Sequence, residues 1–238
     1  MKKRLLSLLV ALCMAVTLLP VSAITAWAED PDPPKSGNCG AGDGSGVTWQ
    51  LTENTDDPST YTLTISGSGA MEDYLMSSNQ PWCSFRKQIT SVVVSPGVTS
   101  IGNLAFALSR NIIHVDIADS VVSIGEHAFS DCSSLTDIKI PQSVTYIDAN
   151  AFDSCTNLSS ITLSTNNITS IRPYTFSGCS KLSSIVIPDG VTSIQLGAFS
   201  DCTSLSSITP QRTKFQLAPC QRPVKNHTTG RLSASVTN

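Results

Sequence analysis

Hydrophobic positions in the middle of the chain recur every 23 or 24 residues. Phenylalanine marks each repeat, and its column consists of Phe106, Phe129, Phe152, Phe176 and Phe199. A cysteine follows three residues after each of the last four phenylalanines. A tandem repeat of this length is typical of a solenoid, in which each coil packs only on its neighbours. We therefore predict five repeats and a partial one, with bounds 89–111, 112–134, 135–157, 158–181, 182–204 and 205–210.

The third unit illustrates the pattern within each repeat. Ile138, Lys139 and Ile140 alternate with the period of a strand that turns one side to the interior. Pro141 ends that strand because it cannot donate a hydrogen bond to a continuing ladder. The pattern at residues 144–147 predicts a second short extended segment, and a tighter turn then directs the Phe152 side chain inward. The fold class is therefore a β-rich repeat solenoid, with a parallel β-sheet face and coils stacked at sheet spacing.

Three segments flank the repeats. Residues 29–46 are rich in Pro, Gly and Asp and predict a flexible lead. Residues 47–88 predict an N-terminal cap, in which 47–52 and 61–66 alternate as the strands of a β-hairpin that covers the first coil. Residues 211–238 carry five basic residues and no acidic one. We predict a disordered basic tail there, although a native cap and a disrupted reading frame remain open alternatives.

The N-terminus has the three parts of a signal peptide. Residues 1–4 form a positively charged segment with three basic side chains, and residues 5–19 are almost uninterruptedly apolar. Ala26 and Ala28 flank Trp27 in a small-x-small cleavage pattern. The apolar run is too short to span a bilayer comfortably, and no second run of that kind follows. We predict that 1–28 is a signal peptide, that the protein is secreted or at the cell surface, and that no membrane span remains after cleavage.

The repeat motif resembles that of a known family. The run Ile-Pro-x-x-Val-Thr-x-Ile-x-x-x-Ala-Phe-x-x-Cys occurs from Ile140 to Cys155, and again from Ile187 to Cys202. It resembles the BspA-type leucine-rich repeat of bacterial surface proteins, over residues 89–208. The resemblance implies an exported or cell-surface protein that binds other proteins, sometimes as an adhesin, and it brings no catalytic residues.

Composition narrows the range of partners. The chain has 15 Lys and Arg against 18 Asp and Glu, and only 14% of its residues are charged. A nucleic-acid binder held by bulk charge needs a basic excess, so we expect no nucleic-acid partner. We expect another protein or an extracellular macromolecule instead. The chain has no phosphate-binding loop, dinucleotide fingerprint or metalloprotease helix motif, so we predict no cofactor.

The cysteine column admits three interpretations. A zinc site needs ligands that converge tetrahedrally on one point, whereas these cysteines form a row along the stack. Equal rotamers in a parallel stack keep neighbouring sulfurs apart, which disfavours disulfides within the row. We therefore predict buried structural thiols. Cys39 and Cys83 lie outside the repeats, and whether they form a disulfide stays open.

One row of polar residues imitates a catalytic triad. Ser91, His114 and Asp137 occupy the same outward repeat position in successive units. A hydrolase needs a nucleophile, a base and an orienting group in a concave site with oxyanion donors, which a row on an open sheet does not supply. We predict no enzyme. The charged residues are expected to form cross-strand pairs instead, His114 with Asp137 and Asp116 with Lys139.

The outward strand positions are the candidate binding residues, because stacked repeats create an extended face suited to a macromolecule. They are Ser91, Val93, His114, Asp116, Asp137, Lys139, Ser160, Thr162, Ser184 and Val186. The predicted function is an interaction or adhesion module without catalysis. Two alternatives are a targeting or stalk fragment of a larger surface enzyme and a purely structural spacer.

Overall fold

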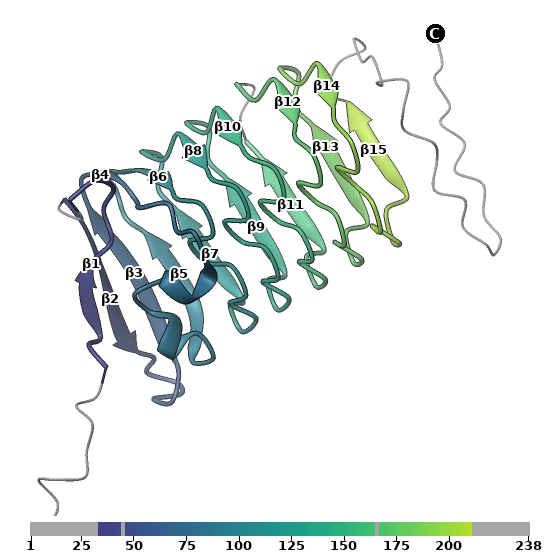
Figure 1. The fold of residues 1–238 in the computed structure, drawn as a ribbon. Coiled ribbons are helices and arrows are strands. Elements are labelled where there is room, and N and C mark those ends of the chain that lie inside the picture. The colour runs from purple at the N-terminus through teal and green to yellow at the C-terminus, as the bar shows by residue number, and fades with distance from the viewer. Residues whose placement is uncertain (1–32, 44–45, 165–166, 211–238) are drawn as a thin grey trace, which may run out of the picture. The chain divides into compact units, whose positions relative to one another are not determined.

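The computed structural model describes residues 33–43, 46–164 and 167–210, in which short strands stack coil upon coil (Figure 1). The predicted signal peptide and basic tail lie outside these residues. Two rows of strands run along the stack. The strands of the first row are β1 (Ser36–Asn38), β2 (Val47–Glu53), β3 (Tyr61–Gly67), β5 (Ile89–Val94), β7 (His114–Ile117), β9 (Asp137–Ile140), β11 (Ser160–Leu163), β13 (Ser184–Ile187) and β15 (Ser207–Pro210).

The second row is made of shorter strands. They are β4 (Gly69–Ala70), β6 (Val98–Ile101), β8 (Ser123–Ile124), β10 (Tyr146–Ile147), β12 (Ser170–Ile171) and β14 (Ser193–Ile194). Two 3-10 turns, η1 (Ser77–Asn79) and η2 (Cys83–Phe85), lie between β4 and β5. The β1–β2 and β2–β3 pairs are antiparallel, and every other pair of named strands is parallel, including β3–β5 and β5–β7. This arrangement confirms the predicted β-solenoid with its N-terminal hairpin.

The alternating pattern sets the inward side of each long strand. In β9, Ile138 and Ile140 are buried whereas Asp137 and Lys139 are exposed, and the strand ends directly before Pro141. The second strand is shorter than predicted, because β10 begins only at Tyr146. The Val144 N–H instead closes a turn by donating to the Pro141 carbonyl at 3.2 Å.

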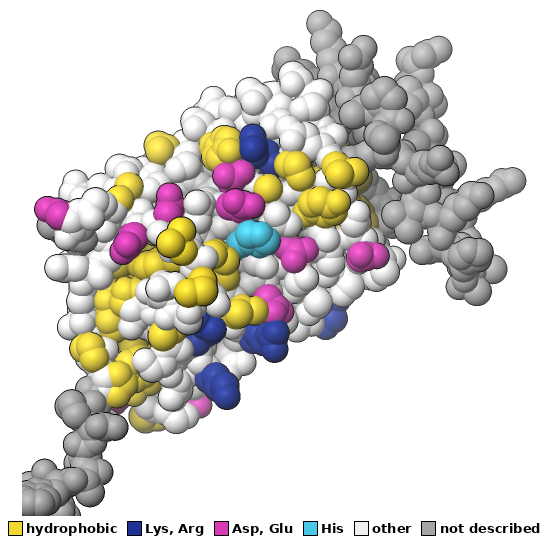
Figure 2. All heavy atoms as spheres, in the orientation of Figure 1, with side chains coloured by type: hydrophobic (Ala, Val, Ile, Leu, Met, Phe, Trp, Pro, Cys, Tyr) yellow, Lys and Arg dark blue, Asp and Glu magenta, His cyan; other side chains and the backbone are white. Residues whose placement is uncertain are grey.

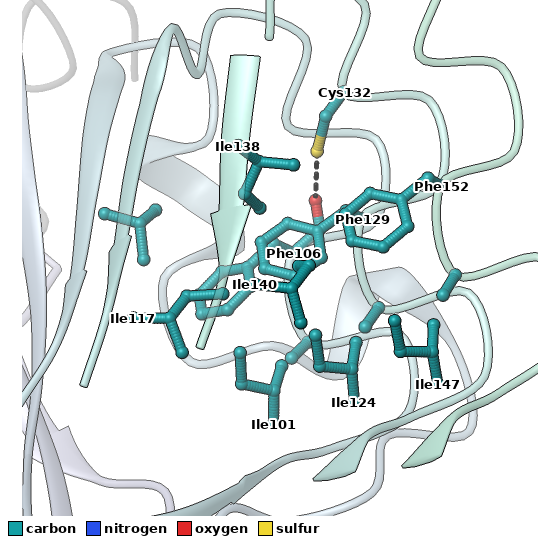
Figure 3. Packing of buried hydrophobic residues seen from close by; sticks show 14 of the residues in the cluster. Ile101, Phe106, Ile117, Ile124, Phe129, Cys132, Ile138, Ile140, Ile147 and Phe152 are labelled. Carbon is teal, nitrogen blue, oxygen red and sulfur yellow. Dashed lines mark hydrogen bonds between the residues drawn. The ribbon is translucent and has the colours of Figure 1, made fainter. Parts of the chain in front are cut away.

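A column of stacked aromatic rings fills the interior (Figure 3). Ring centroids are 5.2 Å apart between Phe106 and Phe129, 5.3 Å between Phe129 and Phe152, and 5.6 Å between Phe152 and Phe176. Each of these four rings is fully buried, and Phe199 continues the stack at 5.5 Å in a partly buried position. The phenylalanine column is therefore the continuous core that links one coil to the next.

The cysteine column is a second internal ladder. The thiol of Cys132 donates to the Phe106 carbonyl of the preceding coil at 3.3 Å (Figure 3), and Cys155 repeats the contact to Phe129 at 3.1 Å. Cys179 and Cys202 do the same at 3.3 and 3.0 Å. Burial raises the pKa of the Cys132, Cys155 and Cys179 thiols well above their ordinary value, and that of Cys202 to about 11.

The prediction of buried structural thiols is confirmed for Cys132, Cys155 and Cys179, whereas Cys202 in the last coil is only partly buried. Cys39 and Cys83 are both free thiols in the structure, Cys39 buried and Cys83 half-buried. Burial raises the pKa of Cys39 to about 12. Thiols of this kind are poor nucleophiles, because the reactive species is the thiolate.

A backbone ladder accompanies the phenylalanine column. The N–H of Phe106 donates to the Ala128 carbonyl of the next coil at 2.8 Å, and the N–H of Phe176 donates to Ala198 at 2.9 Å. In the first four units, the N–H groups of the residues two positions before and two positions after each phenylalanine also donate to carbonyls of the next coil. These residues have positive φ angles, as at His127 (54°) and Asp131 (61°), which turn their N–H groups along the stack axis.

Candidate functional site

The ten outward residues predicted from the sequence lie in two adjacent columns along the first row of strands, and we call this surface the strand face. Ser91 pairs with His114 and Val93 with Asp116 between β5 and β7. The next printed pairings join Asp137 with Ser160 and Lys139 with Thr162 between β9 and β11, and then Ser184 with Ser207 and Val186 with Thr209 between β13 and β15.

Exposure varies along the strand face. Ser91 and Val93 are half-buried in β5, next to the cap, whereas the other eight candidates are exposed. Val186 is 53% exposed, a large value for an aliphatic side chain on a sheet. The accessible part of the surface therefore runs from β7 to β13, with serine, threonine and valine around a charged middle.

The expected cross-strand pairs are wrong. Within the described residues, His114 and Asp137 form no hydrogen bond or ion pair with each other, and neither do Asp116 and Lys139. The Asp137 carboxylate instead accepts a hydrogen bond from the hydroxyl of its neighbour Thr136 at 2.9 Å. β7 and β9 belong to separate hydrogen-bonded groups of strands, so no backbone ladder between these two strands holds the side chains opposite each other.

The charged middle of the strand face is thus left available for contacts with another molecule. His114, Asp116, Asp137 and Lys139 all point outward from β7 and β9, so that both signs of charge lie close together. Exposed charges arranged in this way steer and select a partner more than they stabilise the fold.

The sequence analysis missed residues that continue the strand face at both ends of the first row of strands. Thr62 and Thr64 of β3 pair with Ser91 and Val93, and their alternation in the cap hairpin was the available signal. Ser207 and Thr209 of β15 continue the columns beyond Ser184 and Val186. The polar columns therefore begin in the cap and continue through the last strand.

A second group of side chains lies at the other row of strands, near β10 and β12. The Arg172 guanidinium lies 5.0 Å from the centre of the Tyr146 ring, and its Nε is 3.0 Å from the Asp148 carboxylate. Tyr146 and Tyr174 are 40% and 39% exposed.

Figure 2 shows acidic side chains along the middle coils on this view and hydrophobic ones gathered over the N-terminal elements. Two strongly exposed apolar residues, Leu75 (91%) and Met76 (60%), precede η1.

The arrangement of the strand face suits binding. Ser91 and His114 are lateral neighbours on an open sheet, and no third residue orients the imidazole among the described side chains. No cluster of three or more potential metal ligands occurs in the ranges that the structure describes. In those same ranges we find no helix with the length and apolar character needed to cross a membrane.

Comparison with known proteins identifies the repeat. Residues 83–217 match the family model of the BspA type leucine-rich repeat region, which has six copies of the repeat. The hydrophobic pattern of the sequence predicts five units and a partial one. The chain belongs to this family. Proteins built from such repeats are typically secreted or exposed at the cell surface, and the family indicates a role in protein interaction.

Solved structures provide further comparisons. A leucine-rich repeat protein of T. pallidum is 24% identical with a TM-score of 0.53, and the match covers 70% of this chain and 82% of that one. A leucine-rich cell surface protein of Faecalibacterium prausnitzii is 30% identical with a TM-score of 0.47, over 76% of this chain and 56% of that one. A leucine-rich repeat protein of Eubacterium ventriosum is 22% identical with a TM-score of 0.39, over 74% and 73%. A search of curated proteins gives no match.

Proposed function

We propose that the protein is an exported interaction module that binds another protein through the strand face and catalyses no reaction. The observation that carries this proposal is the continuous pair of outward columns from β7 to β13. The eight candidates on these strands are exposed, and the charged residues among them make no cross-strand pair. An extended sheet surface of this kind offers many contacts to a macromolecule and little enclosure to a small substrate.

Export rests on the sequence of residues 1–28, which we propose to be removed as a signal peptide. The mature chain would then begin at Glu29 and act outside the cell or at its surface. Adhesion is the form of interaction that we favour, because a secreted repeat protein with an open polar face meets other macromolecules rather than metabolites. The partner class is a protein of the host matrix or of the bacterial wall.

A charge swap tests whether the strand face binds the partner. The purified chain 29–238 is used as bait against host matrix proteins and bacterial wall extracts. The double variant Asp116→Lys/Lys139→Glu reverses the charge pattern at the centre of the strand face without changing the net charge. We expect it to weaken capture of the partner about tenfold, because exposed charge patterns govern encounter and specificity.

The matched control is Asp119→Lys/Lys181→Glu, which makes the same charge exchange at two exposed positions in turns outside the strand face. We expect capture by this control to stay within about twofold of the parent chain. Equal capture by both double variants, with a partner bound in each case, would remove the strand face as the binding surface.

A further inference from the structure

The second row of strands carries side chains that the repeat itself does not require. Tyr146 stands in a column that otherwise consists of Ser100, Ser123, Ser170 and Ser193. In the parallel β10–β8 ladder it pairs directly with Ser123, so a small side chain is sufficient for the strand at this position. The Tyr146 ring is 40% exposed, and its role therefore lies at the surface rather than in the core.

The Tyr146 ring holds Arg172 in place together with a carboxylate. The guanidinium lies 5.0 Å from the ring centre, and its Nε is 3.0 Å from Oδ1 of Asp148. The Ala149 N–H donates to the same oxygen at 2.7 Å, which fixes the carboxylate in turn. A guanidinium that is restrained in this way presents its Nη donors in a fixed direction and loses little freedom when a ligand binds.

A second ring, that of Tyr174, lies against Gly197 of the following coil. A Cβ atom at Gly197 would be 2.3 Å from Cε1 of Tyr174, so the ring occupies the space of a side chain at 197. The positive φ of Gly197 (62°) does not demand glycine, because Asn150 (56°) and Tyr174 (54°) adopt it in the two preceding coils. Glycine at 197 thus serves to make room for the Tyr174 ring.

We call Tyr146, Arg172, Tyr174 and Leu196 the tyrosine strip. They come from β10, from the segment after β12 and from the segment after β14, which follow one another along the stack (Figure 1). Leu196 is 59% exposed and ends the strip. With coils at the usual sheet spacing, the strip extends about 10 Å along the stack axis.

The side chains of the tyrosine strip select a ligand by two properties. The faces of tyrosine rings are partly negative and attract C–H groups, which are partly positive. The charges of Arg172 and Asp148 balance each other, so the pair favours neutral groups that both donate and accept hydrogen bonds, as hydroxyls do. A pyranose with equatorial hydroxyls combines both properties, because its axial C–H groups form flat apolar faces and its hydroxyls surround them.

We infer that the tyrosine strip binds a neutral β-1,4-linked glycan, whose flat chain lies along the stack axis. One sugar packs on the Tyr174 ring. Hydroxyls of its neighbour accept from the Nη groups of Arg172 and donate to the Asp148 carboxylate. Tyr146 and Gly197 are positioning residues, the first for the guanidinium and the second for the Tyr174 ring. This site is separate from the strand face and does not depend on the function proposed for it.

The test titrates the chain 29–238 with cellotetraose and follows binding by NMR chemical shifts. We expect saturable binding with a Kd on the order of 1 mM, as for an open and shallow site. Maltotetraose is the matched probe, because it has the same four glucose units joined by α-1,4 links that curve the chain away from a flat surface. We expect maltotetraose to bind at least about fivefold more weakly.

Three variants test the assignment of residues. Tyr174→Asn introduces the residue that Asn150 provides in the preceding coil, so the variant should fold, and we expect cellotetraose to bind at least about tenfold more weakly. Gly197→Ala keeps the Tyr174 ring but takes its space, and we expect about threefold or greater weakening. The control Leu75→Ser removes a side chain that is 91% exposed on the cap, and we expect no change in binding.

The strand-face variant Asp116→Lys/Lys139→Glu separates this inference from the proposed function, because it should bind cellotetraose as the parent chain does. The inference is overturned by the absence of saturable binding up to about 10 mM cellotetraose, by equal binding of the two tetraoses, or by unchanged binding in Tyr174→Asn. Loss of a captured protein partner in Tyr174→Asn, with no binding of either tetraose to the parent chain, would also overturn it and would make the strip a protein contact.

Discussion

Replacing Phe152 by alanine is expected to lower the free energy of unfolding by about 3–5 kcal/mol. The ring is fully buried and lies between Phe129 and Phe176 at 5.3 and 5.6 Å, so its removal leaves a cavity that the stacked coils cannot collapse to fill. Urea unfolding of the variant and the parent chain under the same conditions measures the difference.

The control for this prediction is Phe199→Ala in the last coil. Among the described rings, that of Phe199 stacks on Phe176 alone, and it is partly buried, so truncation should cost clearly less than at Phe152. Equal losses at the two positions, or no loss at Phe152, would contradict the account of the phenylalanine column as the core that couples the coils.

The second large effect is a loss of stability at alkaline pH. Burial raises the pKa of the Cys132, Cys155 and Cys179 thiols above the ordinary value of 9.0. The native state therefore keeps these protons after the unfolded state has begun to release them. The resulting stabilisation is complete below about pH 9 and is lost as the pH rises above it, by about 1.4 kcal/mol per pH unit for each thiol.

Urea unfolding between neutral pH and pH 10 measures this slope. The variant Cys155→Ala removes one such thiol together with its hydrogen bond to the Phe129 carbonyl. Above pH 9, the free energy of unfolding of this variant should fall less steeply with pH than that of the parent chain, and the difference is the contribution of one thiol. Tyr74, whose pKa is also raised by burial, adds to the loss only near the upper end of the range and is common to both chains. An identical slope for Cys155→Ala would show that the thiol protons are not linked to folding.

The repeat columns made most of the fold predictable. Phe152, Cys155 and Ile147 recur in phase across units, and residues that recur in phase must face the same interior when coils stack. The outward columns followed from alternation in the same strands. Such predictions succeed because burial depends on the position in the coil rather than on detailed side-chain geometry.

Other features depend on contacts that no column encodes. The pairs His114–Asp137 and Asp116–Lys139 were expected from adjacency alone, but hydrogen bonding between β7 and β9 is interrupted. Gln80 occurs once, outside the repeat, so no periodic signal indicates that its side-chain amide donates to the Ala107 carbonyl of the first coil. The direction of the backbone ladder likewise follows from the φ angles two residues from each phenylalanine, at residues as different as Leu104 and Asn150.

Site-specific photo-crosslinking tests the central claim, that the strand face is the binding surface, most directly. A photoreactive phenylalanine is placed at Lys139, in the middle of the strand face, or at Lys181, an exposed position in a turn outside it. Each chain is irradiated with the captured partner. The account predicts crosslinks to the partner from position 139 and few or none from 181. Crosslinks from position 181 with none from 139 would contradict it.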